Sequence, residues 1–69
     1  MPLHNKVREC RFFANEMTQH QLAEAVGVTR QTIMAIEKGR YSPSLEVAFK
    51  IAFVFNKSLD EVFWYTPDS

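Results

Sequence analysis

The sequence predicts an all-α domain built from five short helices. Apolar residues recur at the three- and four-residue spacing of helices, and no stretch keeps the alternation of a half-buried strand. The two glycines, Gly27 and Gly39, each follow a helical pattern at a point where a left-handed residue would end it. With 69 residues the chain has room for one domain, which we place at residues 1–69.

The composition excludes several classes of protein. Eight basic and eight acidic residues balance, but the basic excess lies in the first half, through Tyr41, where any nucleic-acid surface is therefore expected. The single Cys10 cannot form an internal disulfide, which fits a reducing cytosol. No apolar run approaches the length of a membrane span, and the chain does not begin like a signal sequence. We expect a cytoplasmic protein that does not associate with membranes.

The first two helices are expected at about 6–14 and at 19–26. The second has a strong start, because Thr18 and Gln21 form a capping box in which each side chain accepts the other's backbone N–H. Its apolar stripe, made of Leu22, Ala23 and Val26, ends at Gly27. Thr29 then caps a third helix, which Gly39 ends.

The fourth and fifth helices occupy about residues 44–64. Ser42 or Ser44 caps the fourth, and its expected core face consists of Leu45, Ala48, Ile51, Ala52 and Phe55. Asn56 can end it because asparagine tolerates the left-handed conformation. Ser58 and Glu61 form a second capping box for a short helix that ends near Trp64.

The second and third helices are separated only by residues 27–29. So short a turn makes two helices cross steeply, as in a DNA-binding helix-turn-helix. Ala23 is small where the helices would pack, and Gly27 suits the positive φ of the turn. Apolar residues fill the inner angle: Leu22, Val26, Val28, Ile33 and Ile36. We predict a helix-turn-helix core at about 18–39.

The same residues carry a resemblance to a known family. The segment TQHQLAEAVGVTRQTIMAIEKG, residues 18–39, resembles the helix-turn-helix of Cro/cI-type (XRE-family) repressors, and residues 40–52 and 58–63 resemble that family's fourth and fifth helices. The resemblance, strongest to small stand-alone prokaryotic regulators, implies a lambda-repressor-like fold. It also implies a dimeric cytoplasmic protein that binds specific sequences in double-stranded DNA.

A helical projection gives the third helix an exposed polar face. At about 100° per residue, Gln31 and Lys38 point away from the core direction defined by Ile33 and Ile36. Arg30 lies in the first turn, at the helix end that such motifs insert into the major groove. Arginine pairs with guanine and glutamine with adenine. The predicted base-reading residues are Arg30 and Gln31, with Thr29 and Met34 secondary; the alternative is a solvated surface.

A second set of residues is expected to contact phosphates, which fixes a protein's register on DNA without reading its sequence. In the resembling family the glutamine that opens the second helix holds the backbone and supports the recognition helix, and Gln19 has that position. Thr18 begins the same helix, whose N-terminal N–H groups suit a phosphate. Just past the third helix, Lys38, Arg40 and Tyr41 match backbone-contacting positions. Lys6 and Arg8 are further candidates, with solubility as the alternative.

One ion pair is expected inside the domain. Glu37 projects about 70° from the core direction, so it is half-buried and needs a partner. The resemblance implies Arg11, because a first-helix arginine pairs with this glutamate in the family. Compared with the resembling family, the link at 12–17 has one residue more and lacks a glycine. Asn15 is therefore expected to take the turn conformation.

The fourth and fifth helices carry more aromatic surface than a small monomer hides. We predict that they form a homodimer interface through Phe53, Trp64, Tyr65 and Phe49. Two-fold symmetry would set two recognition helices about 34 Å apart, one turn of DNA. The alternative is that Phe49 and Trp64 complete the core.

These features favour a homodimeric repressor that binds a palindromic operator. The alternative is an antitoxin-like or adaptor module that binds another protein through the aromatic residues, with DNA binding secondary. We expect neither an enzyme nor a cofactor, because no catalytic grouping or phosphate loop is present. Nor do we expect a metal site, because His4, His20 and Cys10 lack metal-ligand spacing.

Overall fold

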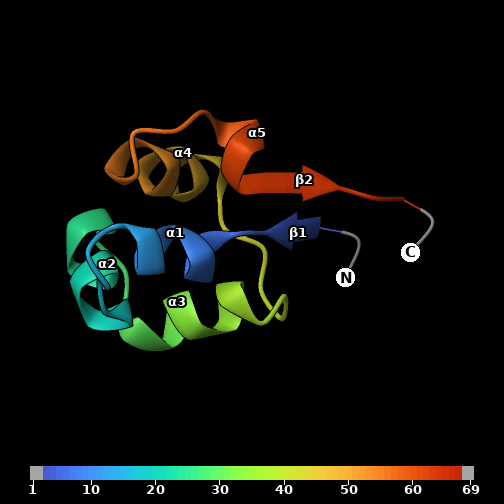
Figure 1. Ribbon diagram of the computed structural model, residues 1–69. Helices are drawn as coiled ribbons and strands as arrows, with labels where there is room; N and C mark the ends of the chain where they lie inside the picture. Colours follow the sequence, from blue (N-terminus) through green and yellow to red (C-terminus); the bar gives the residue numbers. More distant parts are fainter. Residues whose placement is uncertain (1–2, 68–69) are drawn as a thin grey trace.

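A computed structural model describes residues 3–67 of the chain (Figure 1). The described elements are β1 (Leu3–Asn5), α1 (Val7–Phe13), α2 (Gln19–Val26), α3 (Arg30–Glu37), α4 (Leu45–Val54), α5 (Leu59–Val62) and β2 (Phe63–Tyr65). The five predicted helices are confirmed, and a two-stranded sheet adds to them. No helix within residues 3–67 is long and apolar enough to cross a membrane.

The sheet joins the two ends of the described chain. β1 runs antiparallel to β2, with Leu3 opposite Tyr65 and Asn5 opposite Phe63. Each strand has three residues, which is too short for an alternating pattern to stand out in the sequence. The expectation that the last helix ends near Trp64 is therefore wrong: α5 ends at Val62, and Trp64 lies on β2.

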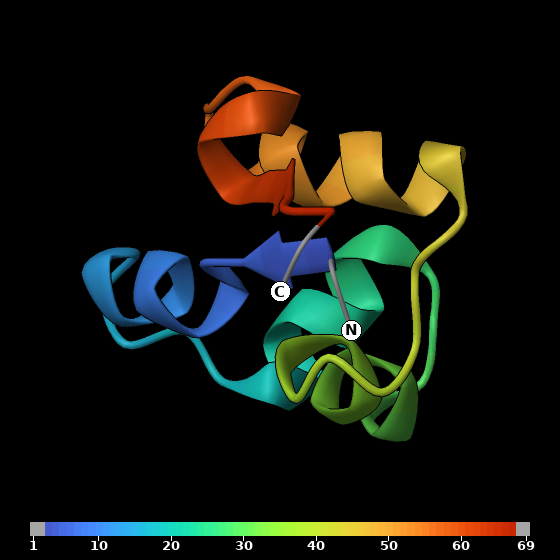
Figure 2. The ribbon, with the colours of Figure 1, turned by 90° about the vertical axis from the view of Figure 1, so that its right-hand side faces the viewer.

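All five helices and β2 contribute to one core. α4 and α5 lie on one side of α1 and β1, and α3 lies on the other side (Figure 1, Figure 2). The buried apolar residues are Val7, Cys10, Leu22, Ala23, Val26, Ile33, Ile36, Ala48, Ile51, Ala52, Val62 and Phe63. Leu45 was expected among them, but this first residue of α4 is 68% exposed because it lies at the edge of the packed face. Phe55 is only partly buried.

The predicted helix ends agree with the backbone. Gly27 and Gly39 have φ angles of 79° and 73°, in the left-handed region that favours glycine. Asn56, with φ of 56°, takes the same conformation after α4. In the long link after α1 the expected turn residue Asn15 has φ of 61°, and Glu16 follows it at 55°.

Side-chain caps fix where the helices begin. Thr18 Oγ1 accepts the Gln21 N–H at 3.0 Å, and Gln21 Oε1 accepts the Thr18 N–H at 2.9 Å, which confirms the capping box. Ser44 caps α4 by accepting the Val47 N–H at 3.2 Å. These caps set the first turns of α2 and α4 by local hydrogen bonds alone.

The cap of α5 makes stability depend on pH. The Ser58 N–H donates to the Glu61 carboxylate at 2.7 Å, and with the Ser58 hydroxyl it lowers the pKa of Glu61 below the usual 4.5. A carboxyl whose pKa is lowered by folding stabilises the fold above its unfolded pKa, and this contribution is lost as the pH falls through the folded pKa.

We therefore expect the free energy of unfolding to decrease below about pH 4.5, and less steeply in Glu61→Gln. Urea denaturation followed by circular dichroism across this range measures the difference. Glu9→Gln, which removes an exposed carboxylate of α1, is the control and should follow the native profile. An unchanged profile in Glu61→Gln would contradict the assignment.

Candidate nucleic-acid interface

The turn between α2 and α3 sets the angle at which α3 leaves the core. Ala23 O accepts N–H groups from both Gly27, at 2.9 Å, and Val28, at 3.1 Å. Val28 packs against the core, and Ile33 and Ile36 are fully buried beneath α3. Because one face of α3 is held inward by these side chains, its opposite face is presented to solvent.

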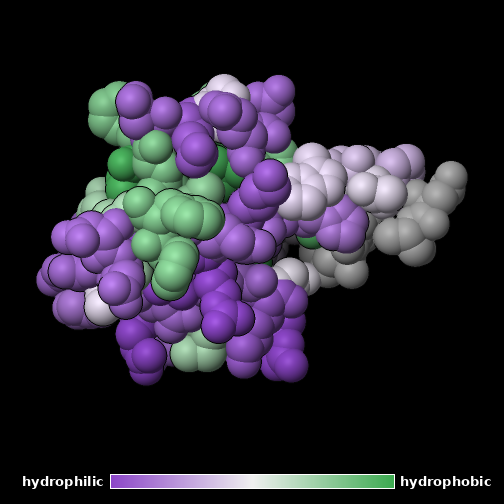
Figure 3. Space-filling model, viewed as in Figure 1, coloured by the Kyte–Doolittle hydropathy of each residue, from purple (hydrophilic) through white to green (hydrophobic). Residues whose placement is uncertain are grey.

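The outward face of α3 begins with polar residues. Thr29 accepts the Thr32 N–H at 3.1 Å and so caps the helix. Arg30 and Gln31 follow it and are exposed, and neither side chain makes a hydrogen bond or ion pair within residues 3–67. Met34 is half-buried. Figure 3 shows that the surface over α3 is largely hydrophilic, whereas apolar side chains gather over α1 and α4.

The residues after α3 continue this exposed surface. Lys38 forms the C-cap, and Gly39 then turns the chain so that the Arg40 N–H reaches Ala35 O at 2.9 Å. Lys38, Arg40 and Tyr41 are all exposed. Two cationic side chains and a phenol are therefore exposed at the end of α3, as phosphate contacts require.

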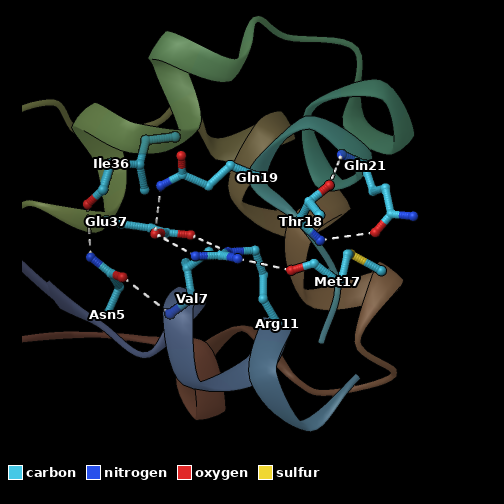
Figure 4. Close-up of polar contacts among 9 residues, drawn as sticks. All are labelled: Asn5, Val7, Arg11, Met17, Thr18, Gln19, Gln21, Ile36 and Glu37. Atoms are coloured by element: carbon cyan, nitrogen blue, oxygen red, sulfur yellow. Dashed lines mark hydrogen bonds and ion pairs between the residues drawn. The ribbon is translucent and has the colours of Figure 1, made fainter. Parts of the chain in front are cut away.

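A part-buried ion pair supports α3 on the side that faces α1 (Figure 4). Arg11 Nε donates to Glu37 Oε2 at 2.6 Å, and Arg11 Nη2 donates to Glu37 Oε1 at 3.0 Å. The side chain of Glu37 is 7% exposed and that of Arg11 is 16% exposed. The pair joins α1 to the last residue of α3, in the two-pronged geometry that arginine and carboxylate favour.

Two further contacts complete this buried cluster. Gln19 Nε2 donates to Glu37 Oε1 at 3.1 Å, so the first residue of α2 reaches the last residue of α3. Arg11 Nη1 donates to Met17 O at 2.8 Å and holds the link before α2 (Figure 4). We call Arg11, Gln19 and Glu37 the support cluster. It connects three helices through one carboxylate.

Asn5 is a supporting residue that the sequence gave no reason to single out. Its Nδ2 donates to Ile36 O at 2.9 Å, and its Oδ1 accepts the Val7 N–H at 3.1 Å (Figure 4). β1 thus ties the last turn of α3 to the start of α1. In the sequence, Asn5 stands out only as an asparagine just before a helix. That position predicts a helix cap but gives no indication of a contact with α3.

The two further candidates on the first helix separate in space. Lys6 lies on the sheet side, with its Nζ 5.8 Å from the centre of the Trp64 ring. Arg8 instead lines a hollow together with Thr18, Gln19 and Arg30. The structure therefore brings Arg8, but not Lys6, to the exposed start of the helix-turn-helix.

The expected interface residues are exposed. Phe49 is 53% exposed, Phe53 is 84% exposed and Tyr65 is 64% exposed. Leu45, expected in the core from the sequence, lies four positions before Phe49. Leu45, Phe49 and Phe53 therefore follow one stripe of α4. Trp64 is 41% exposed and stacks on His4. Phe49 and Trp64 therefore do not complete the core.

Cys10 and the imidazoles take no part in a common site. Cys10 is buried, and burial raises the pKa of its thiol, as in a packed core residue. His4 stacks on Trp64, whereas His20 lies on α2. The exposed face of α3 therefore offers hydrogen-bonding and charged side chains. Together with the fold, this face defines the class of protein: a helix-turn-helix domain that binds DNA.

Comparisons with known proteins agree with this class. Residues 7–62 match the helix-turn-helix family HTH_3. An uncharacterized HTH-type transcriptional regulator of Methanocaldococcus jannaschii is 50% identical over 64 residues, which is 93% of this chain and 96% of the relative. The uncharacterized HTH-type transcriptional regulator YgzD of Bacillus subtilis is 50% identical over 94% of this chain and 97% of its own length.

A more distant relative is the cryptic phage CTXphi transcriptional repressor RstR of Vibrio cholerae, 33% identical over 84% of this chain and 51% of the relative. The chain therefore belongs to the XRE-type helix-turn-helix family of transcriptional regulators. This is a family of DNA-binding proteins, not a class of enzymes.

The support cluster yields a stability prediction. Glu37→Ala removes the shared acceptor and leaves Arg11 Nε and Nη2 and Gln19 Nε2 without their partner, so we expect a loss of about 3 kcal/mol in the free energy of unfolding. Urea denaturation at neutral pH measures it. Arg11→Met/Glu37→Met should recover part of the loss, because neither charge is then buried alone.

The exposed pair of Glu46 and Lys50, 3.2 Å apart on α4, is the matched control. Glu46→Gln should change the stability by less than about 0.5 kcal/mol, because exposed pairs contribute little. Equal losses in Glu37→Ala and Glu46→Gln would contradict a supporting role for the buried carboxylate.

Proposed function

We propose that the protein is a homodimeric repressor that binds a palindromic operator in double-stranded DNA. The observation that supports this most strongly is the combination of a free polar edge on α3, at Arg30 and Gln31, with the buried support cluster behind the same helix. A helix held this way loses little conformational freedom when it enters a groove. The favourable free energy of its contacts with DNA is therefore not offset by an entropic cost of ordering the helix.

Arg30 and Gln31 are the proposed base-reading residues. Arginine can donate two hydrogen bonds to guanine O6 and N7, and glutamine can pair with adenine N6 and N7 in the major groove. The exposed Thr29 and half-buried Met34 border this edge and would make secondary contacts, including apolar contact with thymine methyl groups.

Phosphate contacts would come from both ends of the motif. Lys38, Arg40 and Tyr41 follow α3, while Thr18 and Gln19 begin α2. The Gln19 side chain donates one of its two amide N–H groups to Glu37, so its second amide N–H and its backbone N–H could donate to a phosphate. Because the chain as a whole carries no net charge, we expect modest affinity that depends on these local cations.

The proposed dimer interface is the apolar surface of α4 and β2, to which we assign the exposed side chains of Leu45, Phe49, Phe53, Trp64 and Tyr65. Its occupant would be the same surface of a second copy, as two-fold symmetry requires. That symmetry would duplicate α3 about 34 Å away, to match two half-sites of a palindrome. A dimer bound this way would repress by occupying promoter DNA, and RstR is a relative described as a repressor.

A protein-binding function is the second candidate, because the same apolar surface could hold a different protein. In that case the protein would act as an antitoxin or adaptor, and DNA binding would be secondary. The salt dependence of DNA binding separates the two: a slope that corresponds to fewer than about two phosphate contacts per monomer would favour the protein partner.

The base-reading assignment is tested by fluorescence anisotropy with a duplex from the region upstream of the protein's own gene and a scrambled duplex of equal length. Arg30→Ala and Gln31→Ala should each lose about 1–3 kcal/mol of preference for the upstream duplex. Arg40→Ala, which removes an exposed cation after α3, should weaken binding to both duplexes alike. Equal affinity of the native protein for both duplexes would contradict the proposed function.

The dimer is tested by Phe53→Asp, which places a charge in the apolar surface. Sedimentation equilibrium should show a monomer, and affinity for the upstream duplex should fall because only one half-site is held. Phe13→Asp is a matched control, since Phe13 on α1 is 82% exposed and Phe53 is 84% exposed. A native protein that is monomeric at micromolar concentration, or a Phe53→Asp variant that still forms dimers, would rule out this interface.

A further inference from the structure

A hollow lies beside the exposed start of α3. Three basic side chains line it from three different helices: Arg8 of α1, His20 of α2 and Arg30 of α3. Arg11 also lines it, but Glu37 already pairs with that guanidinium. The hollow is therefore lined by basic groups that no local sequence motif brings together.

His20 is the group in this hollow whose charge can change near neutral pH. Its side chain is 68% exposed, and its Nε2 lies 3.5 Å from Glu24 Oε2, one turn later on α2. Histidine is the residue type that gains or loses its charge between about pH 5 and 8. Uptake of a proton by this imidazole would add one positive charge to the hollow.

The sign of this change follows from the other charges that face His20. Arg8 and Arg30 are basic and Glu16 of the link is acidic, and all three line the hollow; Glu24 does not line it but faces His20 along α2. Apart from the paired Arg11, these two positive and two negative charges balance. Protonation of His20 then leaves the hollow with a net positive charge, which attracts an anion.

The neighbourhood of α3 indicates which anion this is. Arg30 both lines the hollow and begins the exposed edge of α3. When the start of a recognition helix enters a major groove, the bordering phosphates pass beside that same turn. The hollow thus lies where a phosphate of bound DNA would come, and a protonated imidazole can donate a short, charge-assisted hydrogen bond to a phosphate oxygen.

We propose that His20 contacts a backbone phosphate of bound DNA from this hollow, so that affinity for DNA rises as the pH falls and the imidazole takes up a proton. The inference rests on the proposed DNA-binding function. It adds a titratable contact to that function, one that strengthens binding without reading sequence.

The test measures how log affinity depends on log potassium chloride concentration, at about pH 5.5 and about pH 8, by anisotropy with a mixed-sequence duplex. The native protein should show a slope steeper at the lower pH by roughly 0.9 per monomer, the value of one added phosphate contact. His20→Gln should remove this difference. His4→Gln is the matched control, because the other histidine of the chain stacks on Trp64 away from the hollow, and it should keep the difference.

The outcomes separate the inference from the function it rests on. Equal slopes at the two pH values, or a pH difference that survives in His20→Gln, would overturn the role of His20 while DNA binding stands. A pH difference lost in His4→Gln would also overturn it. Absence of binding to any duplex at either pH would overturn the DNA-binding function itself, and with it the contact.

Discussion

The arrangement of the domain depends on how one buried carboxylate is satisfied. Glu37, at the end of α3, cannot remain charged inside the fold without partners, and Arg11 and Gln19 supply them from α1 and α2. Because the three groups come from three helices, the cluster fixes the rotation of α3 about its axis. Asn5 adds a third attachment to α3, through Ile36 O. The rotation that buries Glu37 is also the one that exposes Arg30 and Gln31.

Charge is distributed in a way that suits this geometry. The chain is neutral as a whole, yet Arg8, Arg30 and Arg40 are exposed around the helix-turn-helix. Arg11, in contrast, is paired with Glu37 within the fold. The exposed apolar residues of the proposed dimer interface lie instead on α4 and β2, while Phe12 and Phe13 are exposed on α1. Polar contacts to DNA and apolar contacts to a second copy would therefore use separate surfaces, so that each can be disturbed without the other.

Much of the fold could be predicted because its signals are local. Capping boxes and left-handed residues depend on a few neighbouring positions, so the five helices and their ends, except the end of α5, followed from the sequence. The contact of Arg11 with Glu37 is not local, and it was expected only from the family resemblance. Asn5 lies 31 positions from Ile36, and the hollow around His20 combines three helices. Neither leaves a pattern in sequence, since folding alone brings those groups together.

Base contacts by the start of α3 are tested most directly by chemical protection of guanine N7, an atom that faces the major groove. A duplex from upstream of the gene would be treated with dimethyl sulfate with and without the protein. We predict protected guanines in two segments about ten base pairs apart on one face of the duplex, with the strongest of them lost in Arg30→Ala. Protection confined to one segment, or no protected guanine N7 in a duplex that is bound, would contradict the assignment of this edge to the major groove.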